Sequence, residues 1–199
     1  MQTRMPTEAR QAAIVAAALE LARGASPALI TTTDIATAVG VTQGAVFKHF
    51  ASKDAIWQAA MQWVRRELLA RLDAAAAAAP TPLQGLGAVF HTHVEFVIDH
   101  PGVPRFIFHE LQQPADSPAK QAVREVMHGY RTLLLRVLAA AVAQRQVPTD
   151  LDQDAAATLF VGIVQGLVMQ SMLAGKPAAM RTQGDRVFAL YLRAIGPTP

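Results

Sequence analysis

Apolar residues recur along this chain at intervals of three and four positions, the spacing of one face of an α-helix. Ile14, Ala18 and Leu21 share one such face, and residues 56–68 repeat the pattern. A sustained alternation of β-branched residues, which would indicate strands, does not occur. Much of the 52% hydrophobic fraction is alanine, a strong helix former. The pattern therefore predicts an all-α protein.

Capping residues and helix breakers divide the chain into about nine helices. The predicted helices begin at Thr7, Thr31, Thr42, Ser52, Thr81, Arg105, Ser117, Thr149 and Thr182. Thr31 with Asp34 and Thr149 with Asp152 are interpreted as capping boxes, and Thr182 with Asp185 is expected to open the last helix. Glycines are expected to end helices at Gly40 and Gly175, and Pro101–Pro104 is expected to break the chain.

Two of the predicted helices, 31–40 and 42–50, are very short and are joined by a turn at Gly40-Val41. Short helices joined in this way are typical of a helix-turn-helix, whose second helix enters the DNA major groove. Residues expected to pack inward and fix the crossing of the two helices are Ile35, Ala36, Val39, Val46 and Phe50.

Residues on the opposite face of the second helix are suited to contacts with DNA. Gln43 can pair with adenine, the Ala45 methyl can contact thymine, and Gly44 lets the backbone approach the groove. Phosphate contacts are expected from lysine and histidine side chains and from helix amino termini, whose dipole favours anions. The candidate DNA contacts are Thr32, Thr33, Thr42, Gln43, Gly44, Ala45, Phe47, Lys48, His49 and Lys53.

The stretch TTTDIATAVGVTQGAVFKHFASKDAI resembles the DNA-binding domain of the TetR/AcrR family of one-component regulators. The sequence departs from the family pattern at Phe47, where the family usually has a tyrosine whose hydroxyl contacts a phosphate. The absence of this hydroxyl removes a hydrogen bond worth roughly 0.5–1.5 kcal/mol. The resemblance implies a helix-turn-helix DNA-binding domain over residues 1–55, with helix 52–79 as connector. Residues 56–199 would form a larger helical domain for effector binding and dimerisation.

The same resemblance implies a homodimer that represses transcription from a palindromic double-stranded DNA operator, with half-sites about one turn (~34 Å) apart. The last two long helices, 149–175 and 182–195, would form the dimer interface. The candidate interface residues are Leu159, Gly162, Ile163, Gly166, Val187, Leu190 and Tyr191.

The resemblance also implies a small-molecule effector that binds among the fifth to eighth helices and releases the operator. Apolar residues with a few polar groups recur on these helices, so the effector is expected to be small and mostly apolar. Each residue could equally be ordinary core. The candidate effector contacts are Phe90, His93, Val97, Phe106, Tyr130, Leu134, Gln165 and Met169.

Charge and composition add little to this picture. The net charge is +3, and residues 1–60 carry five Lys or Arg against four Asp or Glu, so charge alone does not indicate nucleic-acid binding. The chain has no cysteine and starts with no apolar signal segment, and Arg136 interrupts its apolar stretch 133–143. A cytoplasmic protein without a membrane span is expected.

Catalytic and metal-binding patterns are not evident. His91 and His93 are two positions apart and therefore point to different sides of a helix, so no metal site is expected. With no nucleophile–base pair and no phosphate-binding loop, the sequence predicts neither an enzyme nor a cofactor.

Two alternatives to a ligand-responsive repressor stay open. One is a DNA-binding regulator of the same fold without a small-molecule effector. The other is an interaction protein that has lost specific DNA binding, which Phe47 and the weak basic charge favour.

Overall fold

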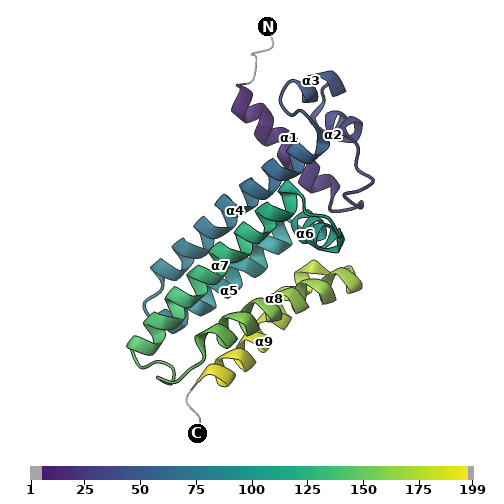
Figure 1. The fold of residues 1–199 in the computed structure, drawn as a ribbon. Helices are drawn as coiled ribbons and strands as arrows, with labels where there is room; N and C mark the ends of the chain where they lie inside the picture. Colours follow the sequence, from purple (N-terminus) through teal and green to yellow (C-terminus); the bar gives the residue numbers. More distant parts are fainter. Residues whose placement is uncertain (1–5, 197–199) are drawn as a thin grey trace. The chain divides into compact units, whose positions relative to one another are not determined.

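The computed structural model describes residues 6–196, which form nine α-helices, one 3₁₀ helix and no strand (Figure 1). The helices are α1 (Thr7–Leu21), α2 (Thr32–Val39), α3 (Gln43–Phe47), α4 (Lys53–Ala78), α5 (Pro82–Asp99), α6 (Gly102–Gln112), α7 (Pro118–Ala143), α8 (Gln153–Ala174), η1 (Pro177–Ala179) and α9 (Met180–Ile195). The all-α prediction is confirmed.

Most predicted helix starts are stabilised by the expected side chains. The hydroxyls of Thr42, Ser52 and Ser117 accept hydrogen bonds from backbone amides three residues ahead, at 3.2, 3.1 and 2.9 Å. Thr81 accepts a longer bond, 3.3 Å, from the amide of Gln84. Each bond satisfies an amide that has no partner within its helix.

Two predicted caps are wrong. Thr7 is the first residue of α1, and Pro6 occupies the cap position without a side-chain bond. The Thr149–Asp152 box does not form, because Asp152 itself is the cap of α8 and accepts from the amide of Ala155 at 2.9 Å.

Two other helix starts lie earlier than predicted. Helix α9 begins at Met180, which is completely buried, so Thr182 lies inside the helix. Helix α6 begins at Gly102, and Pro104 lies in its first turn. A proline is tolerated there because first-turn amides have no partner within the helix.

The chain divides into two compact units. Unit 1 comprises Met1–Arg66 and His100–Val126, and unit 2 comprises Glu67–Asp99 and Met127–Pro199. Helices α4 and α7 therefore each contribute to both units.

Unit 1 contains the short amino-terminal helices together with α6. The rings of Trp57 on α4 and Phe106 on α6 are stacked, with centroids 4.5 Å apart. Helix α6 also approaches α1 so closely that a Cβ atom at Gly102 would lie 1.9 Å from the Leu19 carbonyl oxygen. Only glycine fits this crossing.

Unit 2 is built on α8 packed against α9, with α5 against both. Its core is an aromatic cluster in which Phe90 is stacked on Phe188 at 4.8 Å, while Phe160 meets Phe90 and Tyr191 edge-on. The Tyr191 hydroxyl donates to the carbonyl of Ala156 at 3.2 Å. Phe90, Phe160 and Tyr191 are among the largest fully buried side chains of the described residues.

Helices α7 and α8 are each long and apolar enough to cross a membrane when only length and composition are considered. Both carry charged groups that are paired within unit 2. Arg131 on α7 donates to Asp154 on α8 at 2.5 Å, and Arg136 pairs with Asp73. The ion pairs and the packing of α8 on α9 match helices of a water-soluble bundle better than membrane spans.

Candidate DNA-binding site

The site begins at the amino terminus of α2, where the predicted capping box is present. The Thr31 hydroxyl accepts from the Asp34 amide at 3.1 Å, and the Asp34 carboxylate accepts from the Thr31 amide at 2.8 Å. The Thr31 side chain also donates to this carboxylate, and these bonds hold the pKa of Asp34 below its usual value. The amides of Thr32 and Thr33 are left pointing out of the helix end.

The turn between α2 and α3 forms at Gly40 as predicted. Its φ of 71° lies in the left-handed region, which glycine adopts at little cost. The amide of Val41 donates to the Ala36 carbonyl at 2.9 Å, and Thr42 then caps α3. Helix α3 ends at Phe47 and not near Phe50, although the turn continues to Phe50 through a bond to the Val46 carbonyl.

The inward face of the two helices agrees with the sequence prediction at four positions. Ile35, Ala36, Val46 and Phe50 are buried, whereas Val39 is only half-buried. Burying such side chains contributes about 1.5–3 kcal/mol for each of the larger ones, so this small core is sufficient to fix the orientation of α3.

The outward face is less uniform than predicted. Thr33, Thr42, Gln43, Gly44, Phe47 and Lys48 are exposed, while Thr32, Ala45, His49 and Lys53 are half-buried. The Phe47 ring, 47% exposed, is placed on the surface and not in the core. A Cβ atom at Gly44 would meet no atom within 4 Å, so the helix surface is open there.

His49 differs from the expectation of an outward phosphate ligand. The Nδ1 atom of its ring is buried and has no hydrogen-bond partner within the described residues. Its backbone carbonyl accepts from the Gln11 side chain at 3.3 Å. The backbone of His49 is therefore tied to α1, and the Nδ1 atom of its ring is turned into the protein.

The candidate base-contacting residue, Gln43, is hydrogen-bonded to a candidate phosphate contact. Its Nε2 donates to the Thr32 hydroxyl at 2.7 Å, although the two residues are 11 positions apart. This bond leaves one N–H and the carbonyl oxygen of the Gln43 carboxamide unused, which is the donor and acceptor pair that adenine requires.

Lys53 occupies a different environment from the one predicted. Its ammonium donates to the backbone carbonyls of Ala28 and Ile30, each at 3.0 Å, and of Pro27 at 3.4 Å. The three N–H groups of the lysine therefore all point to the loop between α1 and α2. One sign of a partner is visible in the sequence, since a cation is unfavourable in the first turn of a helix unless another group holds it, but this sign does not tell which group that is.

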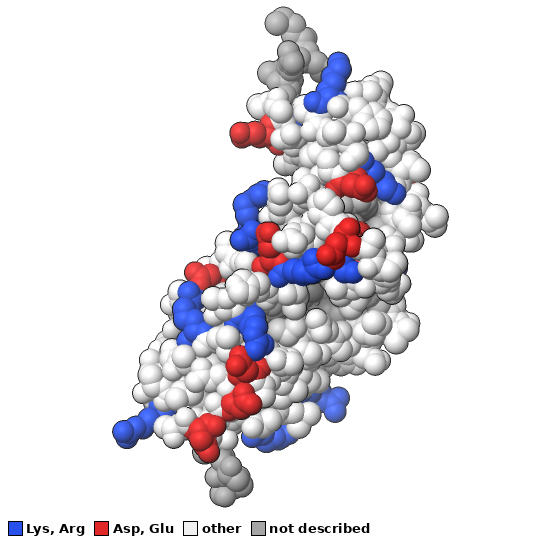
Figure 2. Space-filling model, viewed as in Figure 1, with Lys and Arg blue, Asp and Glu red and all other residues white. Residues whose placement is uncertain are grey.

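Charged side chains do not form a continuous basic surface on the face shown in Figure 2, where blue and red groups are interspersed. Neighbouring side chains of opposite charge form ion pairs, including Arg65–Glu125 at 2.7 Å in unit 1 and Arg181–Glu95 at 2.6 Å in unit 2. Lys48 is exposed on the outward face of the helix-turn-helix, the candidate recognition surface, so it is the lysine best placed to meet a phosphate.

The eight candidate effector contacts are not brought together. Phe90, Val97, Tyr130 and Leu134 are buried in unit 2, with His93 half-buried beside them. Phe106 belongs to unit 1, and Gln165 and Met169 lie on an exposed face of α8, Met169 with 43% of its surface accessible. Because α8 is apolar on nearly all sides, helical spacing alone did not show which of its faces is buried.

His93 and Tyr130 form a polar pair within the apolar interior of unit 2. The His93 Nδ1 lies 2.9 Å from the Tyr130 hydroxyl. Desolvation lowers the pKa of His93 to about 4, and burial, followed by the nearby Tyr191, raises the pKa of Tyr130. Both groups are therefore neutral at physiological pH.

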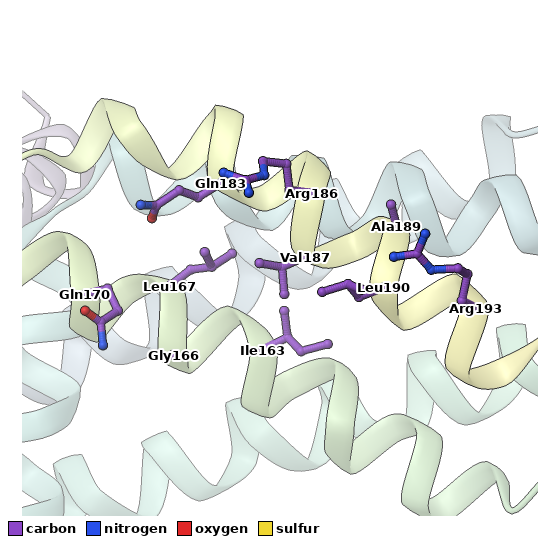
Figure 3. A pocket seen from close by; sticks show the side chains of 10 residues that line it. All are labelled: Ile163, Gly166, Leu167, Gln170, Gln183, Arg186, Val187, Ala189, Leu190 and Arg193. Atoms are coloured by element: carbon purple, nitrogen blue, oxygen red, sulfur yellow. The ribbon is translucent and has the colours of Figure 1, made fainter.

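The predicted dimer face forms a groove of about 800 Å³ between α8 and α9. Figure 3 shows Ile163 and Leu167 from α8 converging with Val187 and Leu190 from α9. Gly166 lies in the groove wall, whereas Leu159 and Gly162 are exposed elsewhere on α8. Tyr191 is a correction, because it is only 1% exposed and belongs to the core.

Polar residues at the rim of this groove were missed by the sequence analysis. They are Gln170, Gln183, Arg186 and Arg193. Helical spacing could have indicated them, because Gln183, Arg186 and Arg193 lie three or four residues from Val187 or Leu190 on α9, and Gln170 lies three residues after Leu167 on α8. Within residues 6–196, no group of three or more His, Asp or Glu side chains is placed to hold a metal ion.

The exposed helix-turn-helix on a helical protein defines a DNA-binding transcription regulator. Residues 14–60 match the model of bacterial regulatory proteins of the tetR family, and residues 112–185 match that of the tetracyclin repressor-like carboxy-terminal domain. The chain belongs to the TetR family of transcriptional regulators.

A relative with a similar sequence and solved structures with a similar fold agree with this assignment. The nucleoid occlusion factor SlmA of Actinobacillus pleuropneumoniae is 26% identical over 137 residues, covering 69% of this chain and 67% of that protein. The transcriptional regulator FadR of Bacillus subtilis, solved with stearoyl-CoA, superposes with a TM-score of 0.77 at 18% identity, covering 90% and 96% of the two chains. The ketosteroid regulator KstR2 of Mycobacterium tuberculosis gives 0.78 at 20% identity, covering 95% and 96%.

Proposed function

We propose that the protein is a ligand-responsive repressor that binds a palindromic operator as a homodimer and is released by a small, mostly apolar effector. The observation that carries the DNA-binding part is the open outward face of α3, where Gln43, Gly44 and Phe47 are exposed above a buried core. Such a face meets the edges of bases, while Lys48 and the amides of Thr32 and Thr33 are available to phosphates.

The homodimer is supported by the groove between α8 and α9. Leu190 in the groove is 55% exposed, and Leu159, one helical turn before Ile163 and outside the groove lining, is 45% exposed, although both are large apolar residues. A second copy of the same face would cover them, since a two-fold interface joins the same patch on both subunits. The arginines at the rim of the groove would then remain near solvent, as is usual at interfaces.

The apolar character of the effector is supported by the interior of unit 2. Aromatic and aliphatic side chains dominate there, and His93 with Tyr130 provides a neutral hydrogen-bonding pair. The structure of FadR contains stearoyl-CoA, whose acyl chain is long and apolar, and KstR2 is named as a ketosteroid regulator. Of the eight candidate contacts, the five in the interior of unit 2, which are Phe90, His93, Val97, Tyr130 and Leu134, are the ones to test first.

The DNA-binding part is tested by titrating fluorescent duplexes from the region upstream of the protein's own gene. We expect binding to one segment about 10³-fold tighter than to random DNA of equal length, the lower range for specific regulators. Equal affinity for both duplexes would favour an interaction protein without specific DNA binding.

Release is tested on the same complex with acyl-CoA esters of increasing chain length and with steroids. An effector should dissociate the complex and raise the melting temperature of the free protein. The same ligand should act less well on variants in which His93 or Tyr130 is replaced by an apolar residue of similar size.

A regulator without a small-molecule effector is the second candidate. It is favoured by the relation to SlmA, which is named for nucleoid occlusion and not for a ligand. Specific DNA binding without release by any compound of the apolar series would support it. In either case we propose a cytoplasmic protein without enzymatic activity, with DNA recognition assigned to residues 1–55 and dimerisation to residues 56–199. In the ligand-responsive repressor, residues 56–199 also bind the effector.

A further inference from the structure

The Lys53 side chain is positioned by contacts within the protein and not by solvent. It is the first residue of α4, directly after the Ser52 cap, and its side chain is half-buried. From there its ammonium reaches the carbonyls of Pro27, Ala28 and Ile30, which belong to the loop between α1 and α2. Charge-assisted bonds of this kind are stronger than bonds between neutral groups.

The loop that Lys53 holds leads directly into the start of α2. Ile30 is 3% exposed and is followed by Thr31, the cap of that helix. Thr32, the next residue, accepts the hydrogen bond from Gln43 on the recognition helix. Ile30, whose carbonyl accepts a hydrogen bond from Lys53, therefore lies only two positions before Thr32, whose hydroxyl orients the candidate base contact Gln43.

From this geometry we infer that Lys53 is a positioning residue, which fixes the loop 27–30 and thereby the amino terminus of α2 against DNA, and does not itself bind a phosphate. All three of its N–H groups are used by the loop, so a phosphate would have to displace at least one backbone carbonyl. The inference rests on the proposed function, because the end of α2 matters only if α2 faces DNA.

Two substitutions distinguish the roles. Lys53→Met keeps the aliphatic stem and removes the charge. Lys53→Arg keeps the charge but replaces three diverging N–H groups by a planar fork, which does not match three carbonyls surrounding one point. A phosphate ligand tolerates arginine, whereas the loop contact does not. The control is Lys48→Met, at the exposed lysine on the recognition surface.

The first measurement needs no DNA. Hydrogen exchange is followed at the amides of Leu29, Thr31 and Asp34, which are bonded to the Ser26 carbonyl, the Asp34 carboxylate and the Thr31 hydroxyl. Both Lys53 variants should accelerate exchange at these amides about tenfold, which corresponds to the loss of one bond of ordinary strength. Lys48→Met should leave them unchanged.

The second measurement is the salt dependence of binding to the upstream duplex. Lys53→Met and Lys53→Arg should both weaken binding about tenfold or more, with an unchanged slope of log K against log salt. Lys48→Met should lower that slope by about two, one phosphate in each subunit of the dimer.

The inference is overturned if Lys53→Arg behaves as wild type in both measurements and Lys53→Met lowers the slope as Lys48→Met does. If Lys53→Met does not fold, the arginine variant decides the question alone. Failure of the wild-type protein to bind the upstream duplex contradicts the proposed function instead, and the exchange measurement still shows whether Lys53 holds the loop.

Discussion

At the scale of single residues, the bond between Gln43 and Thr32 gives a specific prediction for base recognition. Because Thr32 orients the carboxamide, Gln43→Ala should weaken operator binding by about 1–3 kcal/mol and relax the preference at one base position. Titrations with all four bases at each operator position measure this effect. An equal loss on operator and random DNA would show that Gln43 does not contact a base.

The control for this prediction is Thr32→Val, which removes the hydroxyl and keeps the shape of the side chain. If Thr32 acts through Gln43, the two substitutions should be non-additive by about 0.5–1.5 kcal/mol in a double-mutant cycle. Strict additivity would mean that the 2.7 Å bond between the two side chains does not support binding.

Phe47 is the second residue with a directional prediction. Its ring is 47% exposed, so a hydroxyl added to it can reach solvent or DNA without displacing core atoms. Phe47→Tyr should tighten operator binding by about 0.5–1.5 kcal/mol, the contribution of one hydrogen bond to a phosphate. Phe47→Leu serves as the control for lost aromatic area. Unchanged affinity of the tyrosine variant would show that position 47 does not face the DNA backbone.

At the scale of helices, the face of α8 and α9 gives a prediction for assembly. A Cβ atom at Gly166 would meet no atom of its own subunit within 4 Å, so Gly166→Arg should leave the fold of one subunit intact. If this face is the dimer interface, the buried arginine should raise the dimer dissociation constant by about 100-fold, as burying an unpaired charge costs several kcal/mol. Sedimentation velocity measures this constant.

The matched control is Ala139→Arg, at an exposed position of α7 outside the groove. It should sediment as wild type. A dimeric Gly166→Arg protein would contradict the assignment of the interface to α8 and α9.

The helices also show which features a sequence can reveal. Capping at Thr31, Thr42, Ser52 and Ser117 was predictable, because a cap depends on residues within one turn. The starts of α8 and α9 were not. Thr149 and Asp152 are both capable caps, and the early start of α9 depends on the burial of Met180, which is decided by its packing in the fold.

The candidate site was also predictable only where it depends on residues that are close in the sequence. Which residues of the helix-turn-helix face inward follows from helical spacing, and Ile35, Val46 and Phe50 are buried as expected. The contacts of Lys53 with the loop could not be predicted, because they join residues more than 20 positions apart through backbone carbonyls. The exposure of Gln165 and Met169 could not be predicted either, since an apolar pattern on α8 does not say which of its faces is buried.

At the scale of the whole molecule, His93 predicts how the stability of the protein varies with pH. Its pKa is about 4 in the folded protein and 6.5 when unperturbed, so the unfolded chain binds more protons between these values. Stability should therefore fall as the pH decreases from 6.5 to 4, by up to about 3 kcal/mol from this residue. Urea unfolding at several pH values measures the change.

The variant His93→Gln should lose most of this pH dependence, whereas His128→Gln, at an exposed position of α7, should keep it. The difference between wild type and His93→Gln isolates the histidine from the carboxylates, which titrate mainly below pH 5. Parallel curves for wild type and His93→Gln would mean that His93 is solvated in the folded protein.

The crossing of α6 and α1 at Gly102 has a consequence for chimeric regulators. An exchange of residues 1–66 alone would pair a foreign α1 and Trp57 with the resident α6, and the Leu19 carbonyl and Phe106 ring would meet unmatched surfaces. A functional graft of new operator specificity should therefore carry residues 100–126 along with the amino-terminal helices. Shorter grafts should be limited to the exposed positions of α2 and α3, where a new side chain displaces no core atoms.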